Sequence, residues 1–149
     1  MFELHPQLAE DCIVLGDFPL CRLLLSRDSN YPWFILVPRQ AGLTEVYQLS
    51  AVDQGRLMTE SCQLSTLIME VFEGGKLNVA ALGNMVPQLH IHHIVRHIGD
   101  PAWPRPVWGV VPARGYGDVE LRDLLARLLP LLRGEEGFQP AADLTPRRG

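Results

Sequence analysis

The chain has 149 residues, which is the length of one globular domain. Hydrophobic residues make up 47% and charged residues 20%, and a composition this apolar excludes a disordered chain. Thirteen Lys and Arg residues against 17 Asp and Glu residues give a net charge of −4, which argues against a general nucleic-acid or anionic-membrane binder. This balance still permits a small anionic ligand held by a few local donors. We therefore expect a single domain over residues 1–149 with no nucleic-acid partner and no membrane partner, and a small-molecule ligand remains open.

Three cysteines, Cys12, Cys21 and Cys62, lack CxxC spacing and each lies in an apolar stretch, which predicts buried reduced thiols. Residues 1–5 have neither a basic region nor an apolar region of the kind found in signal peptides. The apolar runs of the chain are far shorter than the ~20 residues needed to cross a bilayer. These features predict a soluble cytoplasmic protein.

The first part of the chain predicts a short helix and three strands. A polar stretch favours a helix around Pro6–Glu10. Two β-rich runs, 12–16 and 20–25, flank a Gly-Asp-Phe-Pro turn and are typical of a hairpin. A third strand, Trp33–Val37, follows a segment dense in turn residues and is closed by Pro38.

The rest of the chain predicts two helices and two strands. Ser50 and Asp53 approximate a capping box at the start of a long helix, which continues at helical apolar spacing to Gly74-Gly75. The later elements are strands at Lys76–Ala81 and Pro87–Ile98, a helix at Asp118–Arg133, and a polar tail from Gly134 to Gly149 that we expect to be flexible.

The order of these elements indicates the fold class. Three strands, a long helix, two strands and a helix describe an α+β protein in which the helices pack on one face of a sheet of about five strands. Short turns between the early strands favour antiparallel pairing over a doubly wound parallel sheet.

Four of the five histidines lie between His90 and His97. Because side chains alternate along a strand, one face of this segment carries its polar residues: Gln88, His90, His92 and Arg96. We expect that face to be solvated. The opposite face is mostly apolar and should pack on the long helix, with His93 as a hydrogen-bonded interior residue, whereas His5 and His97 should face solvent.

Three chemistries could use such a face. Two histidines separated by one residue can bind a metal ion, but the fourth residue after His92 is Arg96, where a metal site of this type needs a carboxylate. A neutral imidazole can instead attack phosphorus and form a phosphohistidine adduct, with Gln88, Arg96 and the turn at Gly83-Asn84 as donors to the phosphate. The third possibility is a binding face without turnover.

The segment from Gln88 to Ile94 resembles the signature of the histidine triad (HIT) superfamily of nucleotide hydrolases and transferases, His-φ-His-φ-His-φ-φ, in which φ is apolar. Residues 77–86 resemble the Asn- and Gly-containing segment that precedes the signature in this superfamily. Residues 23–38 resemble the strand-turn-strand that shapes the nucleoside pocket. The resemblance covers about residues 20–98.

The resemblance implies a role for each matching residue. His90 corresponds to the nucleophile that attacks the α-phosphate and forms a nucleotidyl-histidine intermediate, and His92 would contact that phosphate or the leaving group. Asn78 and Asn84 would donate to the phosphate, and Ser26 would lie beside the ribose. The resemblance also implies a homodimer with sheets paired across the interface, and chemistry that needs no metal or other cofactor.

Two segments depart from the family pattern. Gln88 replaces the first histidine of the signature, so an amide that cannot titrate occupies a position of the proton network. This leaves an alternative function open, a nucleotide-binding module with weakened catalysis. The segment with Trp103 and Trp108 also differs, and its indoles could anchor the segment to the sheet or lie at the rim of the pocket or at a dimer interface.

Overall fold

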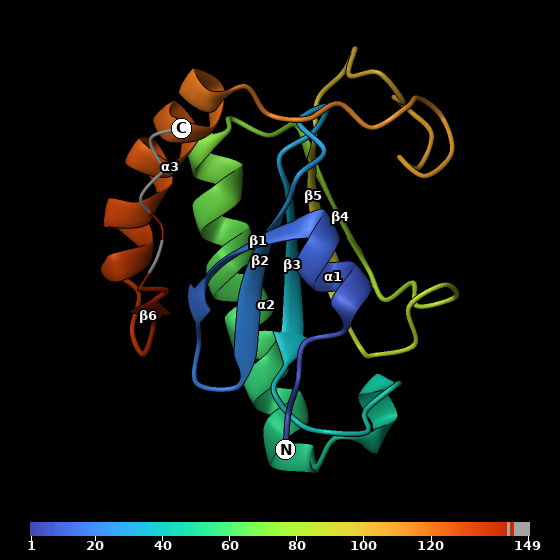
Figure 1. The fold of residues 1–149 in the computed structure, drawn as a ribbon, viewed down its shortest axis with the longest axis vertical. Helices are drawn as coiled ribbons and strands as arrows, with labels where there is room; N and C mark the ends of the chain where they lie inside the picture. Colours follow the sequence, from blue (N-terminus) through green and yellow to red (C-terminus); the bar gives the residue numbers. More distant parts are fainter. Residues whose placement is uncertain (143, 145–149) are drawn as a thin grey trace.

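The computed structural model describes residues 1–142 and 144 and has the α+β architecture that the sequence predicts (Figure 1). One antiparallel sheet of six strands has the order β4-β5-β3-β2-β1-β6. The elements in chain order are α1 (Pro6–Asp11), β1 (Cys12–Asp17), β2 (Cys21–Ser26), β3 (Trp33–Pro38), the 3-10 helix η1 (Val46–Gln48), α2 (Ala51–Val71), β4 (Lys76–Ala80), β5 (Ile91–Arg96), α3 (Asp118–Arg133) and β6 (Gln139–Pro140).

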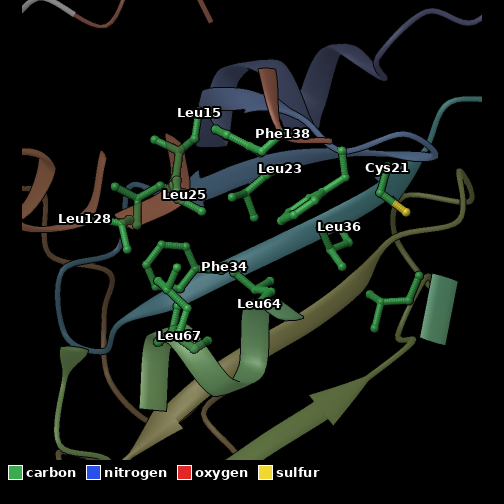
Figure 2. Close-up of a cluster of buried hydrophobic side chains, with 14 of the residues drawn as sticks. Leu15, Cys21, Leu23, Leu25, Phe34, Leu36, Leu64, Leu67, Leu128 and Phe138 are labelled. Carbon is green, nitrogen blue, oxygen red and sulfur yellow. The ribbon is translucent and has the colours of Figure 1, made fainter. Parts of the chain in front are cut away.

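The main core lies between the sheet and the helices α2 and α3. Alternate residues of the central strands point toward this layer and meet leucines of the two helices (Figure 2). The side chains at its centre are fully or nearly fully buried: Leu23, Leu25, Phe34, Leu36, Leu64 and Leu128. Each such burial contributes roughly 1.5–3 kcal/mol. Ile91 and Val95 of β5 belong to the same core, so this layer also holds the strand that carries His92.

The opposite face of the sheet is also covered, which the sequence did not predict. Figure 1 shows α1 in front of the sheet and α2 behind it. Leu8 of α1 packs on Leu24, Ile35 and Val37 of the central strands. Residues of the segment 100–117 pack beside them on Ile94 of β5. The expected packing of the long helix and the C-terminal helix on one face is confirmed, and α1 covers the other face.

This cover changes the environment of the histidine-bearing face. The exposed fractions of His90, His92 and Arg96 are 5%, 6% and 1%, so the expectation of a solvated face is wrong. The alternation itself is confirmed, because His92 lies on the α1 side while His93 is fully buried and contacts Ser61 of α2. His5 and His97 are half-buried rather than solvent-facing.

The boundaries of β5 differ from the predicted strand. Regular pairing with β3 covers Ile91 to Ile94, and the residues before Ile91 form an irregular segment. Leu89 keeps a single backbone bond of 2.9 Å to the carbonyl of Leu43. Because His90 lies just before the strand, it has no paired residue on β3. The neighbouring backbone determines its environment instead.

The segment predicted as a flexible tail begins with packed residues. Phe138 is buried edge-on against Phe18, with ring centroids 5.1 Å apart, and Gln139–Pro140 pairs with β1 at Gly16 and Asp17. A Cβ at Gly16 would lie 2.4 Å from the carbonyl oxygen of Gln139, so this pairing requires glycine there. It supplies the sixth strand, and residues 143 and 145–149 lie outside the described residues.

The cysteines are all free thiols, and two of them match the prediction. Cys12 and Cys21 are buried, and burial raises the pKa of the Cys12 thiol to about 12. Cys62 is exposed, contrary to the expectation, because it lies on a turn of α2 that faces away from the sheet. Among the described residues, no helix is long and apolar enough to cross a membrane.

Candidate active site

A cavity of about 840 Å³ lies on the α1 side of the sheet, over β3 and β5. Its floor contains Trp33, Ile35 and His92, and its walls come from α1, the end of β2, the loop before β5 and the segment 108–115. A smaller cavity of about 170 Å³ shares Asn84 and His90 with it. Of the residues proposed from the sequence, the large cavity collects four: Ser26, Asn84, His90 and His92.

His90 is held by the backbone next to it. Its Nδ1 lies 2.7 Å from the carbonyl oxygen of Gln88. A carbonyl oxygen only accepts hydrogen bonds, so Nδ1 carries the proton and, in the neutral ring, Nε2 carries the lone pair. The structure therefore presents His90 in the tautomer that a nitrogen nucleophile needs.

His92 stands beside His90, with the ring centroids 4.8 Å apart. The indole Nε1 of Trp33 donates to His92 Nδ1 at 3.0 Å. Burial is the main cause that lowers the pKa of His92 to about 4, and the neighbouring His90 and His93 lower it further, while a backbone hydrogen bond at Leu82 opposes the shift. His92 is consequently neutral near pH 7.

The two tryptophans after β5 have different positions. Trp103 stacks on the guanidinium of Arg96, 5.5 Å from its ring centroid, and so anchors the segment to the sheet. Trp108 is 37% exposed, lines the large cavity and meets the His92 ring edge-on at 5.1 Å. Two of the placements considered from the sequence therefore occur. Trp103 anchors the segment to the sheet, and Trp108 lies at the rim of the pocket.

Arg96 and Asn78 are not brought to the cavity. The Arg96 guanidinium donates two bonds to Asp100, at 2.7 and 3.0 Å, and a third to Asn78 Oδ1 at 2.8 Å. Burial alone would raise the pKa of Asp100. The hydrogen bonds that Asp100 accepts from Arg96 and from the backbone N–H groups of Ala102 and His97 outweigh burial and lower that pKa to about 2. Arg96 therefore forms a buried ion pair with Asp100 and a hydrogen bond with Asn78, in place of the phosphate contacts expected for Arg96 and Asn78.

Gln88 also faces away from the cavity. Its Oε1 accepts from the backbone N–H of His5 at 2.9 Å, and its Nε2 donates to the carbonyl of Glu3 at 2.8 Å. The side chain therefore ties the N-terminal residues to the loop before β5, while the carbonyl of the same residue orients His90. An amide suits this position because its donor and its acceptor point to the same side.

His93 is the interior histidine that the sequence predicts. Its Nδ1 lies 3.0 Å from the Ile91 carbonyl and its Nε2 lies 2.7 Å from Ser61 Oγ, so the serine hydroxyl donates to it. Burial lowers the pKa of His93 to about 4, and it contributes a neutral, hydrogen-bonded ring to the core.

Several cavity residues were missed by sequence reasoning. The sequence indicates no individual role for Trp33, although it lies in the segment 23–38 that resembles a pocket-forming strand-turn-strand. It indicates none for the residues of the α1 wall either: Leu8, Glu10 and Asp11. The residues around Asp28 predict a turn, but its side chain also lines the cavity and accepts from the backbone N–H of Arg114 at 3.3 Å. These residues meet the histidines only through long-range packing. Among the described residues, no group of three His, Cys, Asp or Glu side chains is arranged to hold a metal ion.

A family model described as the HIT domain matches residues 7–99. The chain belongs to the HIT family. The matched range includes both histidines of the cavity and ends just before the segment that carries Trp103 and Trp108.

Solved HIT-family structures are similar over most of the chain. A histidine triad protein from Marinobacter aquaeolei is 54% identical, with a TM-score of 0.87 over 90% of this chain and 98% of that chain. One from Bradyrhizobium japonicum is 46% identical, with a TM-score of 0.84 over 87% of this chain and 96% of that chain. A histidine triad protein from Sinorhizobium meliloti is 39% identical, with a TM-score of 0.85 over 89% of this chain and 98% of that chain. Comparison with curated proteins gave no match.

Proposed function

We propose that this protein is a nucleotide hydrolase or nucleotidyl transferase that acts at the α-phosphate through a nucleotidyl-histidine intermediate on His90. The HIT family generally consists of nucleotide hydrolases and transferases, which supports the class. The observation that carries the proposal is the bond from His90 Nδ1 to the Gln88 carbonyl, because it leaves the lone pair on Nε2 of a residue that lines both cavities.

The reaction proceeds in two displacements. Nε2 of His90 attacks the α-phosphorus, an N–P bond forms, and the bond from phosphorus to the leaving group breaks as that group departs with the electron pair. A water oxygen then attacks phosphorus and gives up a proton, and the N–P bond breaks with its electron pair returning to Nε2. The ring thereby loses its positive charge and keeps its proton on Nδ1. A nucleoside monophosphate is released and neutral His90 is regenerated.

The two cavities suggest how a substrate is placed. The apolar walls of the large cavity suit a nucleoside, with Leu8, Ile35 and Trp108 against the base and Ser26 beside the sugar. The small cavity, with Thr44 at its wall, takes the leaving group. Asn84 belongs to both cavities and can donate to the phosphate between them.

The experiment that tests the proposal is release of AMP from adenosine phosphoramidate, with and without a chelator. Positioned imidazoles and amides supply the nucleophile and the donors, so we expect release that the chelator leaves unchanged. Loss of release on chelation would indicate metal-dependent chemistry instead. No release at high enzyme concentration would contradict the proposal for this substrate class.

A second candidate function is a nucleotide-binding module with weakened catalysis, and the observation that favours it is Gln88 in place of a titratable histidine. Gln88→His separates the two candidates. If the amide marks lost catalysis, the variant should gain rate strongly. We expect no gain, because the diverging nitrogens of an imidazole cannot form both bonds to Glu3 and His5, and lost hydrogen bonds should cost about 1–3 kcal/mol of stability. Steady-state kinetics and thermal unfolding measure both effects.

We also propose a homodimer in which the sheets pair across β4. This strand is one of the two outer strands of the sheet and pairs only with β5 among the described strands. Val79 on it is 50% exposed, and an open edge of this kind favours pairing with another chain. Sedimentation velocity of the wild type beside Val79→Lys tests this, with a shift toward monomer expected for the variant and equal association contradicting the edge as the interface.

A further inference from the structure

Trp33 lies beside His92 because of the register between β3 and β5. Ile35 is the direct partner of His92, and Trp33 is the partner of Ile94, so the indole is the diagonal neighbour of the imidazole on one sheet face. The rings are 5.6 Å apart, and the indole Nε1 reaches His92 Nδ1 at 3.0 Å.

The chemistry of this hydrogen bond permits one assignment of the protons. An indole N–H donates and cannot accept, so His92 Nδ1 must hold a lone pair. The neutral ring then carries its proton on Nε2. An imidazolium would place a second N–H against the indole N–H, so the same contact disfavours the cation.

The two histidines nearest to His92 act in the same direction. The titratable groups beside it on β5 and before it are His93 and His90, and a positive charge on either would repel an imidazolium. Trp108, which packs on its other side, brings no charge. A backbone hydrogen bond at Leu82 acts in the opposite direction. So does the net negative charge of the cavity walls, which carry three carboxylates and one guanidinium: Glu10, Asp11, Asp28 and Arg27. Burial and the two histidines outweigh them, so the pKa of His92 stays below its ordinary value.

We propose that Trp33 is a positioning residue that holds His92 as the neutral Nε2–H tautomer. Resting on the proposed function, this makes His92 a hydrogen-bond donor to the phosphoryl oxygen or leaving group, while His90 holds the opposite tautomer and attacks. His92 keeps its proton during the displacement, so the proton that an amine leaving group takes up comes from water or from the substrate. The two neighbouring imidazoles thereby have different roles, one set by a backbone carbonyl and the other by an indole N–H.

The test is NMR of protein labelled with ¹⁵N in the histidine rings, which reports tautomer and ionisation without turnover. In the wild type at pH 7 we expect His92, assigned by its loss in His92→Gln, to show the Nε2–H pattern. In Trp33→Phe we expect a mixture of tautomers and a higher titration midpoint. Trp108→Phe is the matched control, since Trp108 packs on the same ring at 5.1 Å by an edge contact, and its tautomer pattern should match the wild type.

An unchanged His92 tautomer and titration in Trp33→Phe would overturn the proposal, as would an equal change in Trp108→Phe. If Trp33→Phe does not fold, the wild-type indole proton of Trp33 decides instead. It should be shifted downfield and protected from exchange, and both properties should disappear in His92→Gln; an unshifted, fast-exchanging proton would contradict the bond.

Turnover gives a separate readout. Trp33→Phe should lower kcat roughly tenfold with a smaller change in KM, less than the 10²–10³-fold that loss of a transition-state donor costs. A changed tautomer without any effect on kcat would overturn the catalytic part of the proposal. Inactivity of the wild type with normal NMR signatures would contradict the proposed function and leave the role of Trp33 in place.

Discussion

Replacement of His90 by glutamine should reduce AMP release from adenosine phosphoramidate on the order of 10⁴-fold or more. Glutamine keeps a polar, planar group near the Gln88 carbonyl, but its amide nitrogen has no lone pair available for attack. Steady-state kinetics of the purified variant measure the effect. Retained turnover in folded His90→Gln would contradict the role of His90 as nucleophile.

The control for this variant is His97→Gln. His97 lies outside both cavities and bonds through Nε2 to the carbonyl of Phe72 at 2.8 Å, so its replacement should leave the rate within about twofold. Thermal unfolding must accompany the kinetics. From the sequence alone, removal of His90 should cost little stability because its face is solvated, but its side chain is 5% exposed, and some loss of stability is now expected.

Asp100→Ala should lower the free energy of unfolding by about 3–5 kcal/mol, because it leaves the Arg96 guanidinium buried without its counter-charge. The two side chains are 1% and 7% exposed and share two hydrogen bonds. Asp100 Oδ1 also accepts from the backbone N–H groups of Ala102 and Trp103, at 3.0 and 2.7 Å. Chemical denaturation of the variant beside the wild type measures the loss.

Arg56→Ala is the matched control, since it removes an ion pair with Asp53 in which the arginine side chain is 60% exposed. Such a surface pair contributes about 0–1 kcal/mol. Equal small losses for Arg56→Ala and Asp100→Ala would show that the buried pair does not hold the segment 100–117 in place. A large loss for Asp100→Ala alone would confirm that the buried pair stabilises the fold.

Local patterns in the sequence predicted the elements well because each pattern has a local physical cause. Ser50 accepts from the backbone N–H of Asp53 at the start of α2, as its capping position predicts. The alternation along β5 likewise separates His92 from His93 as expected. The resemblance of residues 88–94 to the histidine triad signature also predicts that His90 and His92 share one site, and both line the large cavity.

The wrong predictions concern residues whose hydrogen-bond partners are distant in the chain, or take the donors that were expected to bind the ligand. Arg96 carries the right charge for a phosphate, but Asp100, four residues later, and the side chain of Asn78 take its donors. Gln88 looked like a substitution within the active site, whereas its amide binds backbone more than 80 residues earlier. No pattern within a single strand shows which of two polar residues turns to the cavity and which to another segment.

The stereochemical course at phosphorus tests the central claim most directly, because it does not depend on accumulation of an intermediate. The substrate is an adenosine phosphorothioate derivative of one configuration at the α-phosphorus, hydrolysed in ¹⁸O-labelled water. Two in-line displacements, first by His90 and then by water, invert the centre twice, so the account predicts retention of configuration. Inversion would mean that water attacks the substrate in a single displacement, and would contradict a nucleotidyl-histidine intermediate on His90.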